Sequence, residues 1–185
     1  RTDLDFQRRE LYLFALFRVL EAGLLALIAF GPADLFVATP TGQVAVAVAV
    51  VASVYLLVSL ALVAQAIRTR SVRGPALLGV AVDVVVAGYV AHAVPDATAG
   101  IALMLLFNVG AASLLLTLRQ GLIVASAASF AMAVAYLWSM AAGSEFARPV
   151  AELMMFTVSF LAIATLTHQL RLHMSATSAL AERRG

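Results

Sequence analysis

Long apolar runs, separated by short segments that carry charge, glycine or proline, repeat along the whole chain. Six of these runs are long enough to cross a bilayer as a helix, which takes about 20 residues. The predicted spans are Leu11–Phe30, Val44–Ile67, Ala76–Val94, Gly100–Leu118, Leu122–Met140 and Val150–Leu170. The stretch VAVAVAVVASV alternates valine and alanine, but both are apolar, so it lacks the polar face of a half-buried strand. We therefore predict an all-α membrane protein, a compact bundle of six transmembrane helices.

The arginines are distributed unevenly between the predicted loops. If both termini are cytoplasmic, most of the twelve basic residues lie on the inner side: Arg1, Arg8, Arg9, Arg68, Arg70, Arg73, Arg119, Arg171, Arg183 and Arg184. The outer loops hold a single arginine and three acids: Arg148, Asp34, Asp96 and Glu145. Because cytoplasmic loops of membrane proteins carry the excess of basic residues, this pattern predicts a multi-pass protein of the bacterial inner (cytoplasmic) membrane with both termini inside.

Composition narrows the class of protein. The 185-residue chain is 63% hydrophobic and 12% charged, with a mean hydropathy of +1.01, whereas soluble domains are nearer half apolar and a quarter charged. It contains no cysteine, which excludes disulfides, and nothing points to nucleic acid. We divide it into a cytoplasmic N-terminal segment (1–10), a six-span domain (11–170) and the start of a cytoplasmic helix (171–185), which we expect to lead into further domains beyond Gly185.

Five polar or charged residues lie within the spans or where two spans meet: Arg18, Glu21, Asp83, Asn108 and Arg119. A charge at the bilayer centre costs at least about 2.5–3.5 kcal/mol, so such groups are expected to face the bundle interior and find partners. Arg18 and Asp83 both lie about 10 Å from the inner boundary, on spans that run in the same direction. We predict an Arg18–Asp83 ion pair. Glu21, one turn further along the face of Arg18, is placed to share the guanidinium.

Three roles remain open for this intramembrane polar network. It can hold the bundle together and fix its register, it can act as a switchable signalling network, or it can form a proton or ion path, as intramembrane acids often do. The sequence favours the structural role first and the switch second. A path is the weakest of the three because the charges are few and the loops are short.

Small residues recur at every fourth position of the fifth span: Gly121, Ala125, Ser129 and Ala133. Small residues at this spacing let helix backbones approach closely in lipid. We predict that they form a helix-packing face, either within the bundle or between copies of the chain.

Motifs for catalysis, cofactors or metals are not recognisable in the sequence. It has no GxSxG, HExxH or phosphate-binding loop, and no converging set of ligands accompanies its three histidines, so we predict no catalytic, cofactor or metal site. The tail RLHMSATSALAERRG is polar and still helix-prone. It indicates that the last helix leaves the membrane without a break and can carry a shift, tilt or rotation into a following domain.

Several segments together suggest a family. They are LFRVLEAGL with Arg18, VAVDVVVAG with Asp83, and the hairpin LLLTLRQGLIVASAASFAMAVAYL with Arg119 and Gly121, followed by a last span that runs into a charged helix. In this pattern, which covers nearly the whole chain, the sequence resembles the N-terminal six-helix transmembrane sensor region of PilS-type sensor histidine kinases. The hairpin is the most specific part of the resemblance.

The resemblance implies the membrane-embedded input domain of a two-component system linked to type IV pilus regulation. Such a kinase acts as a homodimer, monitors pilin in the membrane and passes phosphate to a response regulator through domains that would follow Gly185. The implied partners are therefore the lipid bilayer and the pilin transmembrane helix, whose acidic residue could meet Arg18 or Arg119. No catalytic residue of the family falls in this chain. The alternatives are a small transporter or channel that uses Asp83, Glu21 and Arg18, or a passive membrane anchor.

Overall fold

Six long helices make up most of the part of the chain that the computed structural model describes, residues 2–31, 42–68, 72–141 and 150–182. The elements are α1 (Thr2–Phe30), α2 (Gly42–Arg68), α3 (Arg73–Ala93), a short 3₁₀ turn η2 (Pro95–Ala97), α4 (Thr98–Leu115), α5 (Leu118–Ala141) and α6 (Val150–Glu182). No strand occurs within these ranges, and each long helix contains an apolar segment that could cross a membrane. The all-helical fold with six candidate spans is thereby confirmed.

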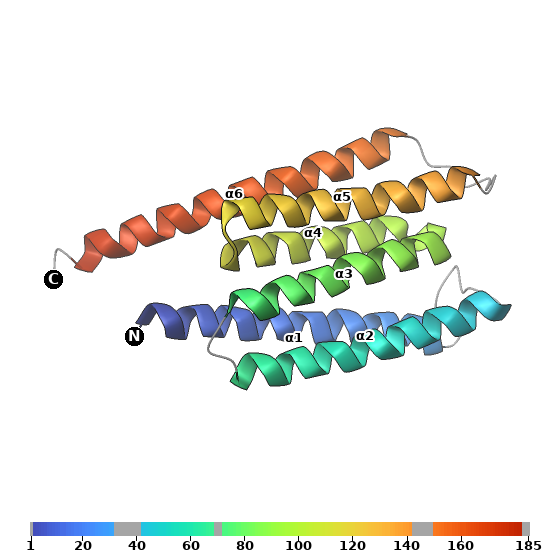
Figure 1. Cartoon of the computed structure of the whole chain (residues 1–185), viewed down its shortest axis with the longest axis horizontal. Helices are drawn as coiled ribbons and strands as arrows, with labels where there is room; N and C mark the ends of the chain where they lie inside the picture. The colour runs from blue at the N-terminus through green and yellow to red at the C-terminus, as the bar shows by residue number, and fades with distance from the viewer. Residues whose placement is uncertain (1, 32–41, 69–71, 142–149, 183–185) are drawn as a thin grey trace.

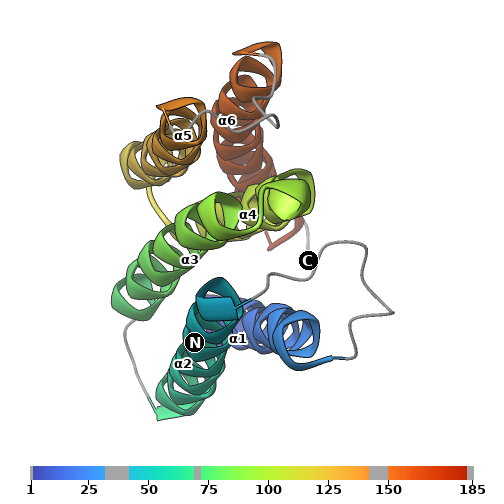
Figure 2. The ribbon, with the colours of Figure 1, turned by 90° about the vertical axis from the view of Figure 1, so that its right-hand side faces the viewer.

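The helices form three layers of antiparallel hairpins (Figures 1 and 2). Consecutive helices pair, α1 with α2, α3 with α4, and α5 with α6. The α3–α4 hairpin lies in the middle, as the end-on view in Figure 2 shows. On one side α2 packs on α3 and α1 on α4, and on the other side α5 packs on α3 and α6 on α4. Among the described helices, the main contacts that join the two outer layers are therefore those made by α3 and α4.

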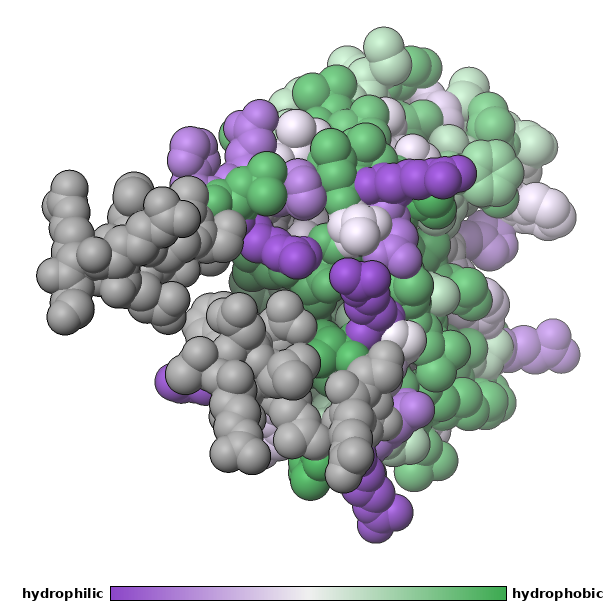
Figure 3. Space-filling model, turned by 60° about the vertical axis from the view of Figure 1, so that its left-hand side comes forward, coloured by the Kyte–Doolittle hydropathy of each residue, from purple (hydrophilic) through white to green (hydrophobic). Residues whose placement is uncertain are grey.

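Both termini lie at the same end of the bundle (Figure 1). Four arginines at this end have exposed side chains: Arg9, Arg68, Arg73 and Arg119. Figure 3 shows hydrophilic side chains gathered here, while the flank of the bundle is largely hydrophobic. The loop residues Asp34, Glu145 and Arg148, on which the predicted orientation also depends, lie outside the described residues, as do Arg1, Arg70, Arg183 and Arg184.

The bundle turns its apolar side chains outward as well as inward. Val85, Phe130 and Met155, on three different helices, are each 70–71% exposed. A soluble protein does not expose large apolar groups on every flank, because contiguous apolar patches on soluble monomers stay within a few hundred Å². These side chains are the surface that a bilayer covers.

The α4–α5 connection is shorter than predicted. We expected the fourth span to reach Leu118 and the fifth to begin at Leu122, but α4 ends at Leu115 and α5 begins at Leu118. The reason is a capping box. The Thr117 Oγ1 accepts a hydrogen bond from the Gln120 N–H at 3.4 Å, and the Gln120 Oε1 accepts one from the Thr117 N–H at 3.2 Å. The helix therefore starts before Arg119, in a segment that we had assigned to the loop.

The last helix extends well beyond its apolar part. The candidate span covers Val150–His173, and the helix continues to Glu182 without interruption. Thirty-three residues at 1.5 Å each give about 50 Å, against about 30 Å for the hydrocarbon core. Figure 1 shows the C-terminal part of α6 projecting past the other helices. The predicted continuity of the last helix beyond its apolar part is observed as far as the described residues reach.

Candidate functional site

A buried ion pair joins the first hairpin to the second. The Arg18 Nε donates to the Asp83 Oδ1 at 2.7 Å, and the Nη2 donates to the Oδ2 at 2.8 Å. This is the two-pronged geometry in which a guanidinium matches a carboxylate best. Both side chains are almost fully buried, Arg18 being 1% exposed and Asp83 3%. The predicted pairing between the first and third helices is confirmed.

Glycine makes room for the guanidinium. Gly79 lies one turn before Asp83 on α3, so both positions face α1. A Cβ built at Gly79 would overlap the Arg18 guanidinium. The Phe14 ring also lies against the cation, with its centroid 4.5 Å from the Arg18 Cζ, which is within the range of a cation–π contact. Arg18 thus fits between α1 and α3 because one position of α3 has no side chain.

A tyrosine from α2 donates a further hydrogen bond to Asp83. The Tyr55 hydroxyl donates to the Asp83 Oδ1 at 2.8 Å, and Tyr55 is itself buried. One carboxylate therefore binds groups from both helices of the first hairpin. Removing a partner from such a pair leaves a buried charge unmatched and typically costs about 3–5 kcal/mol. This network fixes how the α1–α2 layer sits on the middle layer.

Glu21 has a different partner from the one we expected. It lies one turn beyond Arg18, but its hydrogen bond comes from the Asn108 Nδ2 of α4, at 2.7 Å from the Glu21 Oε2. The ion pair within bonding distance that Arg18 makes is with Asp83. The sharing of the guanidinium by two acids is therefore not observed. The Glu21–Asn108 bond instead forms a second link between the first and middle layers.

These polar groups share one depth in the membrane. Asp83 is the middle residue of α3, ten residues from either end (83 − 73 and 93 − 83), and Tyr55 is the middle residue of α2 (55 − 42 = 68 − 55). We call the set Arg18, Glu21, Tyr55, Asp83 and Asn108 the polar layer. Towards the termini it is followed by packed apolar side chains, among them Leu11, Phe14 and Val80. Away from the termini it adjoins a cavity of about 460 Å³.

Comparison with protein families identifies this architecture. The family model described as "PilS-like transmembrane domain" matches residues 2–181, nearly the whole chain. The chain belongs to this family. The comparisons with curated proteins and with solved structures gave no significant match. The predicted resemblance to the six-helix region of PilS-type proteins is therefore confirmed at the level of the membrane domain.

Arg119 of the PilS-like domain does not belong to the polar layer. It lies in the first turn of α5, at the end of the bundle that carries the termini, and its side chain is exposed. The small residues that follow it face the bundle only in part. Gly121 and Ala125 are buried. A Cβ added at Gly121 would lie 3.0 Å from the Ser113 Oγ. Ser129 and Ala133, further along, are half-buried.

In the PilS-like domain a further arginine makes partly buried contacts that the sequence did not reveal. The Arg171 Nη1, on α6, donates to the backbone carbonyls of Leu114 at 3.3 Å and Leu116 at 2.9 Å. These carbonyls lie at the C-terminal end of α4, where helix carbonyls lack intrahelical partners and a cation is favoured. Arg171 therefore ties α6 to α4 at the point where α6 leaves the bundle.

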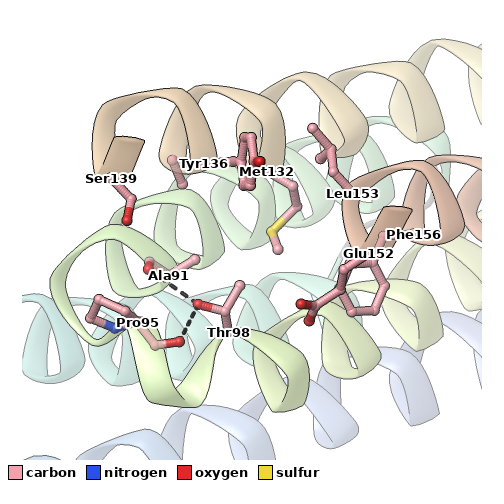
Figure 4. A pocket seen from close by; sticks show the side chains of 10 residues that line it. Ala91, Pro95, Thr98, Met132, Tyr136, Ser139, Glu152, Leu153 and Phe156 are labelled. Atoms are coloured by element: carbon pink, nitrogen blue, oxygen red, sulfur yellow. Dashed lines mark hydrogen bonds between the residues drawn. The ribbon is translucent and has the colours of Figure 1, made fainter. Parts of the chain in front are cut away.

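A second, smaller hollow lies at the opposite end of the PilS-like domain (Figure 4). It measures about 40 Å³ and lies between the α3–η2–α4 turn, α5 and α6. The Thr98 hydroxyl bonds the carbonyls of Ala91 at 3.3 Å and Pro95 at 2.7 Å, and the Glu152 carboxylate points towards Thr98 (Figure 4). Thr98 thus closes the α3–α4 turn, so we assign this hollow a structural role. Among the described residues no cluster of three histidine or acidic side chains could hold a metal.

Sequence reasoning missed three residues of the site: Gly79, Tyr55 and Arg171. The signal for Gly79 was available, because a glycine one turn from an intramembrane acid marks a face that a bulky partner can approach. Tyr55 gave a weaker signal, since a mid-span tyrosine needs a partner for its hydroxyl. Arg171 looked like an ordinary positive-inside residue.

Proposed function

We propose that this chain is the membrane-embedded input domain of a sensor histidine kinase, that it detects a membrane partner such as type IV pilin, and that α6 relays the signal to a cytoplasmic kinase. Membership of the PilS-like transmembrane domain family supports the sensor role. The exposed arginines at the end that holds the termini support a cytoplasmic location for that end, by the positive-inside rule, and hence an inner-membrane protein with both termini inside.

The observation that carries this proposal is the course of α6. It runs from the membrane segment to Glu182 as one helix, and Arg171 connects it to the end of α4 just before it projects. A rigid helix that is tied to the middle layer at its exit transmits a displacement of that layer as a shift or rotation of its projecting part. A bundle that only anchors a protein has no need for such a connection.

In this proposal the polar layer is the part of the bundle that switches between two arrangements of its ion pair. In the arrangement described here Arg18 is fully committed to Asp83. An acidic side chain brought in by a partner helix would compete with Asp83 for the same guanidinium, and the bundle would then shift towards the state with the greater affinity. Arg119, being exposed at the start of α5, is one of the cations that a partner can reach without opening the bundle.

A chimeric kinase tests the proposal. Residues 1–185 are joined, in helical register with α6, to the dimerising and catalytic domains of an unrelated sensor kinase, and autophosphorylation is measured in membrane vesicles with and without pilin. We expect pilin to change the rate at least threefold, and we expect Asp83→Asn and Arg18→Gln each to fix the output at one extreme. Val85→Leu, a change on the lipid-facing side of α3, is the control and should leave the response intact. If the output is the same in all samples, the chain is not an input domain.

A second candidate is a small transporter or channel, and the cavity beside Glu21 and Asp83 is the observation that favours it. The Arg18–Asp83 pair and the packed apolar side chains on its far side would then act as the gate. Proteoliposome flux distinguishes the two functions. A transporter shows flux that Asp83→Asn abolishes, whereas an input domain changes kinase output with no flux.

A further inference from the structure

The cavity next to the polar layer occupies the half of the bundle away from the termini. Its walls come from α1, α2, α3, η2 and α4, so it lies between the first and middle layers. It extends along α4 from Asn108 to Gly100, nine residues whose eight rises correspond to about 12 Å. Leu24, which is 44% exposed, also lines it, so its wall reaches the lateral surface of the bundle.

The floor of this cavity holds two buried hydrogen-bond acceptors. Glu21 and Asn108 are each 2% exposed, and both line the cavity. Their mutual bond uses the Glu21 Oε2 and the Asn108 Nδ2. The Glu21 Oε1 and the Asn108 Oδ1 have no hydrogen-bond partner among the described residues. Buried oxygens of this kind are costly in a protein interior, and in native structures such groups call for an explanation.

The charges around the floor are also unequal. The guanidinium of Arg18 is matched by Asp83 in a two-pronged pair, and Tyr55 donates its hydroxyl to the same carboxylate. Glu21 remains as an additional acid that has no cation within ion-pair distance in the described part of the chain. The group that complements this floor is therefore a positively charged donor of several hydrogen bonds.

We propose that the cavity binds a single-chain amphiphile with a primary ammonium head, which donates to the Glu21 Oε1 and the Asn108 Oδ1 while its alkyl chain lies along the apolar walls towards Gly100. The volume of about 460 Å³ is within the range of ligand pockets, about 300–1,000 Å³, and so suits a free molecule. The lining at Leu24 gives such a molecule access from the bilayer. Binding does not depend on the proposed sensor function, because it is measured on the chain alone.

Three probes with the same chain length test the assignment: decylamine, decanol and decyl methyl ether. Binding to the purified chain in detergent micelles at neutral pH is measured by native mass spectrometry and by the rise in the thermal unfolding midpoint. The ammonium head offers three donors, the alcohol one and the ether none. We expect decylamine to bind at least tenfold more tightly than the ether, with decanol between them. Equal affinity for all three would mean that the cavity accepts only hydrocarbon, and would overturn the proposal.

Two variants locate the site. Glu21→Gln removes the charge with little change of shape, and we expect it to lower decylamine affinity at least tenfold while the ether is unaffected. Ala87→Phe places a ring in the cavity and should weaken all three probes. Ala127→Phe, on the exposed side of α5, is its matched control and should bind like the unmodified chain. If Ala87→Phe does not fold, Glu21→Gln alone decides, and undiminished decylamine binding to it would overturn the proposal.

Discussion

Gly79→Ala is the most direct perturbation of the polar layer, because it adds one methyl group against the Arg18 guanidinium. The far end of an arginine side chain can move aside, so the steric overlap itself is easily relieved. Moving it, however, takes the guanidinium away from Asp83 in a site where Arg18 is 1% exposed. The substitution therefore tests an electrostatic consequence through a steric change.

Two opposing terms set the magnitude. Loss of one partner from a buried pair costs about 3–5 kcal/mol, whereas alanine is more favourable than glycine in a helix interior by about 0.5–1 kcal/mol. We expect a net loss of about 2–4 kcal/mol in the free energy of unfolding. Gly23→Ala is the control, since no heavy atom lies within 4 Å of a Cβ at that position. It should be neutral or stabilising by up to about 1 kcal/mol.

The assay is equilibrium unfolding in mixed micelles, with increasing SDS and with helix content followed by circular dichroism. Gly79→Ala is also made in a background with both Arg18→Met and Asp83→Asn, which removes the two charges. Comparing its effect in the two backgrounds isolates its interaction with the ion pair. In the background without the charges Gly79→Ala should lose most of its effect. If Gly79→Ala is as stable as the unmodified chain, or if its effect persists without the charges, then the pair does not depend on the space at Gly79.

Further predictions concern single contacts. Tyr55→Phe removes the donor to the buried carboxylate and should lower the free energy of unfolding by about 1.5–3 kcal/mol in the same assay. The control, Tyr89→Phe at an exposed position, should change it by under about 0.5 kcal/mol. Equal effects of the two changes would contradict the assigned bond. Arg171→Gln weakens the bonds to the end of α4 and should speed amide exchange in α6 beyond the bundle, measured by mass spectrometry, with no change in α1. Gly121→Val crowds Ser113 and should destabilise by about 1–3 kcal/mol; unchanged stability would place that face outside the packed interior.

Much of the architecture follows from the sequence because lipid imposes strong constraints. A backbone in hydrocarbon must satisfy its own hydrogen bonds, so six apolar runs give six helices, and the first span was predicted with the bounds Leu11–Phe30 that the structure has. The Arg18–Asp83 pair followed from depth alone, since two parallel helices bring equal offsets to the same level. The further expectation that Glu21 shares the guanidinium was wrong, since Glu21 bonds Asn108 instead.

The remaining contacts depend on rotation of each helix about its own axis, which depth does not determine. Glu21 is as near to Arg18 in sequence as a neighbour on one face can be, yet it bonds Asn108 of α4, because α1 touches both α3 and α4 across the layer. The early start of α5 was recoverable, since Thr117 and Gln120 have the spacing of a capping box. The predicted loop over residues 119–121 was wrong, because these residues belong to the first turn of α5.

The order of synthesis gives the Arg18–Asp83 pair a consequence for how the chain is made. The two residues are 65 positions apart, and at about 5–20 residues per second the ribosome needs roughly 3–13 s to travel that distance. During this interval the first hairpin carries an arginine within the apolar part of the bilayer before Asp83 exists. We expect the nascent α1 to stay beside the insertion machinery, or to keep its guanidinium drawn towards the interface, until α3 arrives. A chain that stops before Asp83 should consequently be a poor membrane protein, and its degradation would provide a built-in check on completed synthesis.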